Sequence, residues 1–266
     1  MNEYSITQIA ATIDALLDVK CHSGAAQPIQ EVLEAAKIHF NGKQCDRVFM
    51  YNPDAIALWV YEKYAQKFAQ LEQKVQLTSK ATTVFPPVTP VCFASMYSGF
   101  EPKKHGIQKY AKPVLAVDTA FDDLPRAGRR AAIVSTQGDS ISRIFLNRNI
   151  DYFIYKTKEE CNEKALELIE RDEHALIVPY NGDYDHWMHR FGPEGKRPLR
   201  ALDENIGTFL DVHKAISKAW KSHSTALFFA PDHGCHAKFR LFGTHGINEP
   251  CDMQTVHFTS FIPPFT

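Results

Sequence analysis

The sequence lacks the features that mark secreted, membrane-bound and nucleic-acid-binding proteins. It has no uninterrupted run of about 18 apolar residues, so we expect no membrane span. The first residues carry acidic groups and no basic segment followed by an apolar core, so we expect no secretory signal. The formal net charge is −1, which provides no basic field for a nucleic-acid polymer or for an anionic membrane.

The cysteines also lack a recognisable pattern. Six of them are scattered along the chain, and none belongs to a CxxC pair. We interpret them as reduced thiols, with disulfide bonds as the alternative. This interpretation predicts a cytoplasmic protein, and the sequence leaves its oligomeric state open.

The chain does contain enough apolar sequence for a sizeable core. It has 266 residues, of which 44% are hydrophobic and 23% charged, as is typical of a folded soluble domain. It contains no low-complexity linker and no internal repeat. We therefore predict one domain over residues 1–266, in which residues 1–45 form a helical N-terminal extension.

Short apolar runs alternate with amphipathic segments along the rest of the chain. The strands predicted from the runs are Arg47–Tyr51, Ala131–Ser135, Tyr152–Tyr155, Ala175–Pro179, Thr225–Ala230 and Val256–Ile262. The predicted helices are Ala55–Val75, Ser140–Leu146, Lys158–Arg171 and Asp203–Lys221. This alternation is typical of an α/β fold, with a mostly parallel sheet and helices on both of its faces.

Three of the predicted strands run into acidic loops. Asp54 follows the first strand, Asp185 follows the run ALIVPY, and Asp232 follows the run ALFFAP. Ligands bind in such sheets at the carboxyl ends of the strands, where these loops would meet. Carboxylates gathered there would repel one another unless a cation lay between them.

Histidines accompany these carboxylates at spacings that suit metal ligands. Asp185 and His189 are four residues apart and would share one face of a helical turn. The complete set has three carboxylates and three imidazoles, which are Asp54, Asp185, His189, Asp232, His233 and His245. Divided between two sites, this set suits zinc, with manganese or iron as alternatives. Two metals about 4 Å apart can hold a phosphoryl group from both sides.

Several segments resemble the motifs of one known family. The segment FPPVTPVCFASMYSG, followed by EPKKHGI, is similar to the nucleophile segment of nucleotide pyrophosphatases/phosphodiesterases, a branch of the alkaline phosphatase superfamily. The segments DHWMHRFGP, APDHG and GTHG are similar to metal-binding segments of that family. The motifs follow the family's order from Asp54 to about Pro263.

The resemblance implies an alkaline phosphatase-like α/β core and a two-metal hydrolase of phosphoric esters. Asp54, Asp232 and His233 would hold one metal ion, with Thr89 as a further ligand. The second ion would be held by Asp185, His189 and His245. Thr89 would be the nucleophile, and the substrate would be a small phosphate ester or a nucleotide.

One departure from the family concerns substrate binding. Tyr110 stands three residues after the HGI motif, with Lys109 beside it, where the phosphodiesterase branch places an Asn that grips a phosphate oxygen. We expect both residues to contact the substrate. They would also suit a phosphomonoester or a phosphonate, so a phosphomonoesterase, a phosphonate hydrolase or a phosphomutase is the alternative. An inactive homologue that binds metal or nucleotide is the second alternative.

Several residues compete for the predicted roles. Asp185 is preferred to Asp183 because only Asp185 has the spacing to His189. Asp54 could simply cap the predicted helix that follows it. The hydroxyls that compete with Thr89 belong to Thr82, Thr83, Ser95 and Ser98. We expect His257 to pack in the sheet. His186 and His236 flank motif residues and are only secondary candidates for supporting the ligands.

Overall fold

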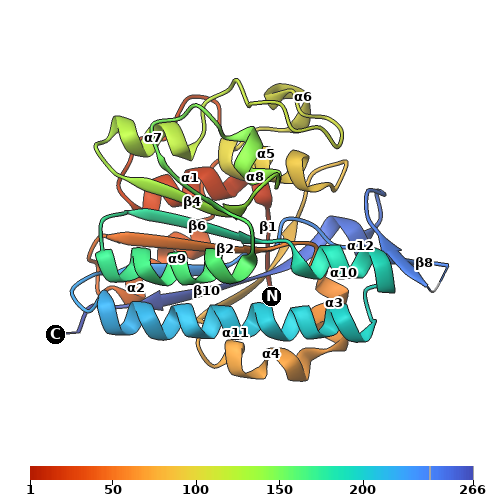
Figure 1. Cartoon of the computed structure of the whole chain (residues 1–266). Helices are drawn as coiled ribbons and strands as arrows, with labels where there is room; N and C mark the ends of the chain where they lie inside the picture. Colours follow the sequence, from red (N-terminus) through yellow and green to blue (C-terminus); the bar gives the residue numbers. More distant parts are fainter. Residues whose placement is uncertain (240, 266) are drawn as a thin grey trace.

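The computed structural model describes residues 1–239 and 241–265, and an eight-stranded sheet lies at its centre (Figure 1). The strand order is β1-β3-β10-β7-β2-β6-β4-β5. Strand β10 is antiparallel to its neighbours β3 and β7, and all other neighbouring strands are parallel. The strands span Asn2–Ser5 (β1), Arg47–Pro53 (β2), Leu77–Thr82 (β3), Ala131–Thr136 (β4), Asp151–Tyr155 (β5), Leu176–Asn181 (β6), Thr225–Phe229 (β7) and Gln254–Ile262 (β10).

Helices cover both faces of this sheet (Figure 1). One face packs against a 3₁₀ turn and five helices, namely η1 (Ile6–Gln8), α1 (Ile9–Leu16), α2 (Gln30–His39), α5 (Thr89–Ser98), α7 (Ala120–Arg126) and α8 (Ile141–Ile144). The other face packs against α3 (Leu58–Lys63), α4 (Ala65–Glu72), α9 (Lys158–Arg171), α10 (Asp183–Phe191) and α11 (Lys196–Ala219). The remaining elements are α6 (Pro102–His105), α12 (Pro250–Met253) and a small antiparallel sheet of β8 (His236–Lys238) and β9 (Phe242–Thr244).

Strand β2 shows why the central strands are apolar almost throughout. Val48 and Met50 point into the hydrophobic cluster on one face of the sheet. Phe49 and Tyr51 point into the cluster on the other face. Because side chains alternate along a strand, a sheet that is covered on both sides buries every position. The predicted mostly parallel α/β fold is confirmed.

The N-terminal segment differs from the helical extension that we predicted. Residues Asn2–Ser5 form β1, which pairs in parallel with β3 and is an edge strand of the main sheet. Helices α1 and α2 then pack on the sheet through buried side chains such as Ile13 and Val32. The prediction missed the strand because NEYS has no apolar run, and its pairing depends on backbone hydrogen bonds with a distant segment.

The predicted helix Ala55–Val75 is two helices in the structure. Ala55 has a φ of 61°, so the chain cannot start a helix there, and α3 begins only at Leu58. A second break falls at Tyr64, whose φ of −114° and ψ of 32° separate α3 from α4. The break lets α3 pack against β10 while α4 packs against α11. The helical periodicity in the sequence was real, but it did not reveal these changes of direction.

Other predicted helices differ mainly in their ends. Helix α9 has the predicted bounds, and the side chains of Thr157 and Glu160 form a capping box at its start. Helix α11 begins at Lys196 instead of Asp203. Pro198 fits in its first turn, because backbone N–H groups there have no partner within the helix. The helix predicted near Ser140–Leu146 is limited to Ile141–Ile144. In the part of the chain that the structure describes, no helix is both long and apolar enough to cross a membrane.

Strands β2, β6 and β7 lie side by side and run in the same direction, so their carboxyl ends meet at one edge. Asp54 follows β2, helix α10 follows β6, and Asp232 follows β7. The sheet therefore brings the three predicted acidic loops together, as expected for a site in a parallel sheet.

Candidate functional site

The first group of candidate ligands consists of Asp54, Asp232 and His233. All three are buried, and each offers one ligand atom within 4.8 Å of those of the other two. The Nε2 atom of His233 lies 3.4 Å from Oδ1 of Asp54 and 3.5 Å from Oδ2 of Asp232. These are three of the residues that the sequence predicted for one metal ion.

Local backbone constraints hold this group in place. Ala55, with its positive φ, turns the chain directly after Asp54, and its amide donates to Oδ1 of Asp232 at 3.4 Å. A Cβ atom on Gly234 would lie 2.2 Å from the carbonyl oxygen of Cys251. Only glycine therefore fits directly after His233, where the backbones of two segments approach closely.

The second group consists of Asp185, His189 and His245. Asp185 and His189 lie one helical turn apart on α10, and Nε2 of His189 is 3.3 Å from Oδ1 of Asp185. His245 follows β9, and its Nε2 is 3.4 Å from the same carboxylate oxygen. Strand β9 packs closely on α10, since a Cβ atom on Gly243 would lie 2.1 Å from the sulfur of Met188. The structure thus divides the six predicted ligands into the two predicted groups.

The imidazoles of both groups are oriented by backbone carbonyls. Nδ1 of His189 is 3.0 Å from the carbonyl oxygen of Gly243, Nδ1 of His233 is 2.9 Å from that of Gly234, and Nδ1 of His245 is 2.8 Å from that of Pro87. A carbonyl only accepts, so these contacts place the proton on Nδ1 and leave a lone pair on Nε2. Histidines that bind metal ions are oriented by such contacts.

The carboxylate oxygens that face these lone pairs also lack donors. Among the described residues, Oδ1 of Asp54, Oδ1 of Asp185 and Oδ2 of Asp232 are buried without a hydrogen-bond partner. Acceptors therefore face acceptors in both groups, an arrangement that a cation would stabilise. The groups adjoin one another, because the ring centroids of His233 and His245 are 4.1 Å apart. The residues present fit two divalent metal ions.

The pKa values of the carboxylates and imidazoles reflect their burial and their closeness to one another. Burial raises the pKa of Asp54 well above its usual range and raises the pKa of Asp232 to about 7. Burial also lowers the pKa of His233 to about 3. For Asp185, burial acts to raise the pKa, but the neighbouring imidazoles of His189 and His245 outweigh it and hold the pKa below its usual range. Burial thus disfavours the ionised form of all three residues, and a bound cation would stabilise the two carboxylates beside a neutral imidazole.

Thr89 places an aliphatic hydroxyl beside the first group. It is the first residue of α5, it is buried, and its Oγ1 lies 3.4 Å from Oδ2 of Asp54 and 3.3 Å from Nε2 of His233. The competing hydroxyls have other partners: Thr82 bonds Glu3, Thr83 bonds the sulfur of Cys92, Ser95 bonds His105, and Ser98 bonds the carbonyl of Ala94. The position of Thr89 agrees with the nucleophile that the resemblance implies.

A cavity of about 570 Å³ adjoins both groups and is lined by Asp54, Thr89, Asp185 and His189. Of the two predicted substrate residues, Tyr110 lines this cavity and Lys109 does not. The cationic side chains that line it come instead from later in the chain, and they are Lys112, Lys156, Lys158 and Arg190. Sequence reasoning missed these residues because nothing local distinguishes them from other surface cations.

Tyr180 is a further residue that sequence reasoning missed. It lies on β6, is buried, and its hydroxyl donates to Oδ2 of Asp54. This contact leaves Oδ1 of Asp54 as the free ligand atom of the carboxylate. The only available signal was a tyrosine near the end of a predicted strand that precedes an acidic loop.

The competing candidates lie outside the two groups. Asp183 forms an ion pair with Lys158. Asp54 does not cap a helix, because the next helix, α3, begins only at Leu58. His257 packs in the sheet, with Nδ1 2.8 Å from the Tyr4 hydroxyl and Nε2 2.7 Å from the carbonyl of Pro231. His186 lines the cavity, while Nδ1 of His236 contacts Asp252 at 2.8 Å.

Comparisons of sequence and of structure give different results. No family model matches the chain, and no curated protein matches it by sequence. Solved structures do match its fold. Murine ectonucleotide pyrophosphatase/phosphodiesterase 5, solved as an inactive variant in complex with AMP, matches with a TM-score of 0.57 and 15% identity over 72% of this chain and 57% of that chain. The human protein of the same name matches with a TM-score of 0.56 and 17% identity over 71% and 57%.

Phosphonoacetate hydrolase from Sinorhizobium meliloti 1021, in complex with phosphonoformate, matches with a TM-score of 0.54 and 14% identity over 74% of this chain and 59% of that chain. The chain therefore spans 57 to 59% of the length of these proteins. At these identities the likeness establishes the fold alone, which is an alkaline phosphatase-like α/β core. The predicted fold class is confirmed.

Proposed function

We propose that the chain is a two-metal-dependent hydrolase of phosphoric esters, similar to a phosphodiesterase or nucleotide pyrophosphatase, with Thr89 as its nucleophile. One observation carries the proposal. Two groups of carboxylates and imidazoles adjoin each other beside a buried threonine hydroxyl, and their acceptor atoms face one another without donors. The AMP and phosphonoformate bound to the structural neighbours support a small phosphorus-containing substrate.

Each group has the ligands for one divalent ion. Asp54, Asp232 and His233, with the Thr89 hydroxyl, would hold one ion, and the group of Asp185, His189 and His245 would hold the other. Nitrogen and oxygen ligands of this kind suit zinc, with manganese as the alternative. Bound ions would neutralise charge on the phosphoryl oxygens and lower the pKa of the attacking hydroxyl.

The protein's own residues would position the nucleophile. The first turn of α5 fixes Thr89, and its hydroxyl points toward Asp54 and His233. In the reaction Oγ1 of Thr89 would form a bond to phosphorus while the bond to the leaving oxygen breaks, and water would then hydrolyse the phosphothreonine. Thr89 is buried and also lines the cavity, so a substrate bound there would reach the attacking oxygen.

The walls of the cavity favour a second candidate within the same reaction class. Lys112 lines the cavity near Tyr110, and its ammonium lies 5.3 Å from the centre of the tyrosine ring. A lysine there would stabilise the additional negative charge of a phosphomonoester or a phosphonate. A panel of p-nitrophenyl phosphate, bis-p-nitrophenyl phosphate and p-nitrophenyl phosphonate esters, assayed with zinc or manganese, would distinguish these substrates. The six free cysteines support a reducing compartment, such as the cytoplasm, as the location.

Substitution of Thr89 is the direct test. Thr89→Ala removes the attacking oxygen and should lower kcat by at least about 10³-fold, which corresponds to about 4 kcal/mol of barrier. Thr89→Ser keeps the oxygen and should retain part of the activity. Thr83→Ala is the matched control, since it removes a buried hydroxyl that bonds the sulfur of Cys92 and lies outside both groups.

The outcomes separate chemistry from folding. All three variants should keep the far-ultraviolet circular dichroism of the wild type, and the control should keep its turnover. If Thr89→Ala hydrolyses every substrate of the panel at near the wild-type rate, the covalent mechanism is wrong. If the wild type binds neither zinc nor manganese and turns over no substrate, the chain is not a two-metal hydrolase.

A further inference from the structure

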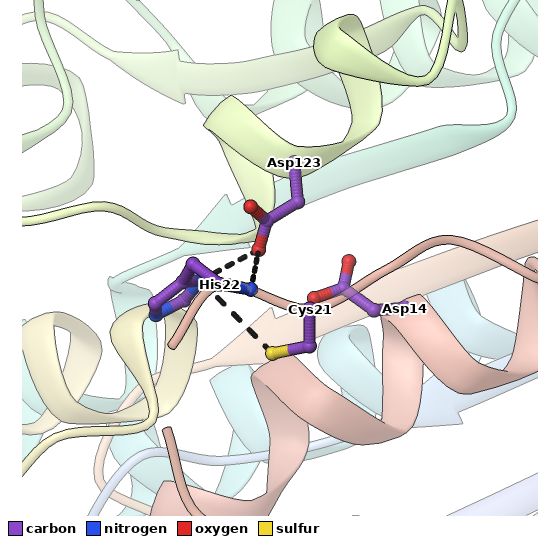
Figure 2. A group of neighbouring side chains, drawn as sticks. All are labelled: Asp14, Cys21, His22 and Asp123. Carbon is purple, nitrogen blue, oxygen red and sulfur yellow. Dashed lines mark hydrogen bonds and ion pairs between the residues drawn. The ribbon is translucent and has the colours of Figure 1, made fainter. Parts of the chain in front are cut away.

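A second cluster of potential metal ligands lies outside the candidate site. It contains Asp14 of α1, Cys21 and His22 of the loop that follows α1, and Asp123 of α7. Each residue offers one ligand atom, and these atoms all lie within 4.8 Å of one another. Figure 2 shows the four side chains converging between α1 and α7. The cluster thus combines a thiol, an imidazole and two carboxylates.

The Asp14 side chain is not satisfied by the surrounding protein. It is 0% exposed, and neither carboxylate oxygen has a hydrogen-bond partner among residues 1–239 and 241–265. Asp123, which is 2% exposed, adds a second carboxylate, but its Oδ1 accepts from Arg126 at 2.8 Å, so the charge without a partner is that of Asp14. Burying two neighbouring carboxylates, one of them unpartnered, is costly unless a positive charge lies between them.

His22 has the orientation of a metal ligand. Its Nε2 lies 2.8 Å from the carbonyl oxygen of Ser98, which can only accept, so Nε2 carries a proton. Its Nδ1 lies 2.6 Å from Oδ2 of Asp123 and 4.0 Å from the sulfur of Cys21. In histidines that bind metal, the ring nitrogen away from the ion commonly donates to a carbonyl in this way.

Two simpler interpretations explain less of the geometry. A protonated His22 would pair with Asp123, but it would leave both oxygens of Asp14 without a partner. A catalytic Cys-His-Asp triad requires the thiol and the carboxylate to contact opposite nitrogens of the imidazole. Here Cys21 and Asp123 both face Nδ1, so His22 could not relay a proton between them.

We propose that Asp14, Cys21, His22 and Asp123 form a structural zinc site, separate from the candidate catalytic site. One sulfur, one nitrogen and two oxygen atoms complete a tetrahedral set, and the thiolate favours zinc over magnesium, calcium or manganese. Zinc binding would displace the thiol proton of Cys21 to solvent. Through the contact of His22 with Ser98, the ion would anchor the N-terminal segment to the C-terminal end of α5, the helix that begins with Thr89.

Cobalt substitution tests this site independently of the other one. The two candidate catalytic groups contain no cysteine, so Co²⁺ bound there gives no charge-transfer absorption from a thiolate. Full-length protein, stripped with a chelator and titrated with Co²⁺, should show such a band. Cys21→Ser should abolish the band and lower the bound zinc by one ion per chain. Cys251→Ser is the matched control, because Cys251 is also half-buried beside a histidine and an aspartate. It should change neither the thiolate band nor the amount of bound zinc.

Alkylation of the wild-type chain provides a test that needs no variant. Zinc should protect Cys21 from iodoacetamide, as measured by peptide mass spectrometry, while Cys251 reacts equally with and without zinc. The proposal is wrong if the wild type shows no thiolate band, if the band survives Cys21→Ser, or if zinc leaves the alkylation of Cys21 unchanged. These readouts do not depend on phosphoester hydrolysis, so a failure here is distinct from a failure of the proposed function.

Discussion

The hydrogen bond from Tyr180 to Asp54 predicts a selective loss of metal affinity. Tyr180→Phe removes one hydroxyl from a buried strand position and leaves the ring in place. A hydrogen bond to a charged acceptor contributes about 1.5–3 kcal/mol. The Tyr180 hydroxyl bonds Oδ2 of Asp54. Its loss in Tyr180→Phe should therefore lower the affinity of the first group for its metal ion by about 10- to 100-fold. Asp54, the acceptor of the Tyr180 hydroxyl, belongs to the first group, so the other ion should keep its affinity.

The same substitution should change the pH dependence of metal binding. Hydrogen bonding from Tyr180 acts to lower the pKa of Asp54, although burial raises that pKa overall. Without the hydroxyl, the pKa of Asp54 should rise further, and protons should compete more strongly with the metal ion. Half-loading of this site should therefore require a higher pH in Tyr180→Phe than in the wild type.

Isothermal titration of chelator-stripped protein with zinc, repeated across a pH series, measures both effects. Tyr51→Phe is the matched control, because Tyr51 is a buried strand residue whose hydroxyl bonds the neutral amide of Asn205 at 2.7 Å. The control should lose about 1 kcal/mol of stability and no metal affinity. Equal affinities in Tyr180→Phe and the wild type, or an equal loss for both ions, would refute the reasoning.

Two further predictions concern the second group and the cavity. His245→Ala should remove one ion and leave the other bound, because its partners Asp185 and His189 serve the same ion, and metal analysis that finds two ions together with full activity would contradict the assignment. Lys112→Ala should raise KM for a phosphomonoester by about 10-fold or more, since it removes a charge that lines the cavity, whereas Lys109→Ala should leave KM unchanged. Equal effects of the two lysine variants would mean that the cavity walls do not select the substrate.

Local sequence patterns predicted the parts of the site that depend on a single element. Asp185 and His189 share a helix face because they are four residues apart. Asp54 and Asp232 each follow a strand of a parallel sheet, so the topology itself brings them to one edge. The predicted residues converge, while their roles in binding metal and in catalysis stay predictions.

Contacts between distant segments could not be predicted in this way. The carbonyl of Pro87 orients His245 across 158 positions of sequence, and Tyr180 bonds Asp54 across 126 positions. The predicted substrate residue Lys109 is exposed and is not among the residues that line the cavity, whereas Lys112 lines it. Such contacts depend on how loops pack together, and a single sequence carries no periodic signal for that packing.

The sequence by itself therefore determined the α/β fold and the carboxylates that gather at one edge of the sheet, because strand and helix periodicities and the residues at strand ends are local properties. Only the tertiary structure placed Asn2–Ser5 in the sheet, since a strand without an apolar run is defined by the segment with which it pairs. Only the tertiary structure brought Asp123 to His22, across 101 positions, and left Asp14 without a partner beside them. The reason is physical, because the cost of a buried charge depends on its neighbours in space and not on its neighbours in sequence.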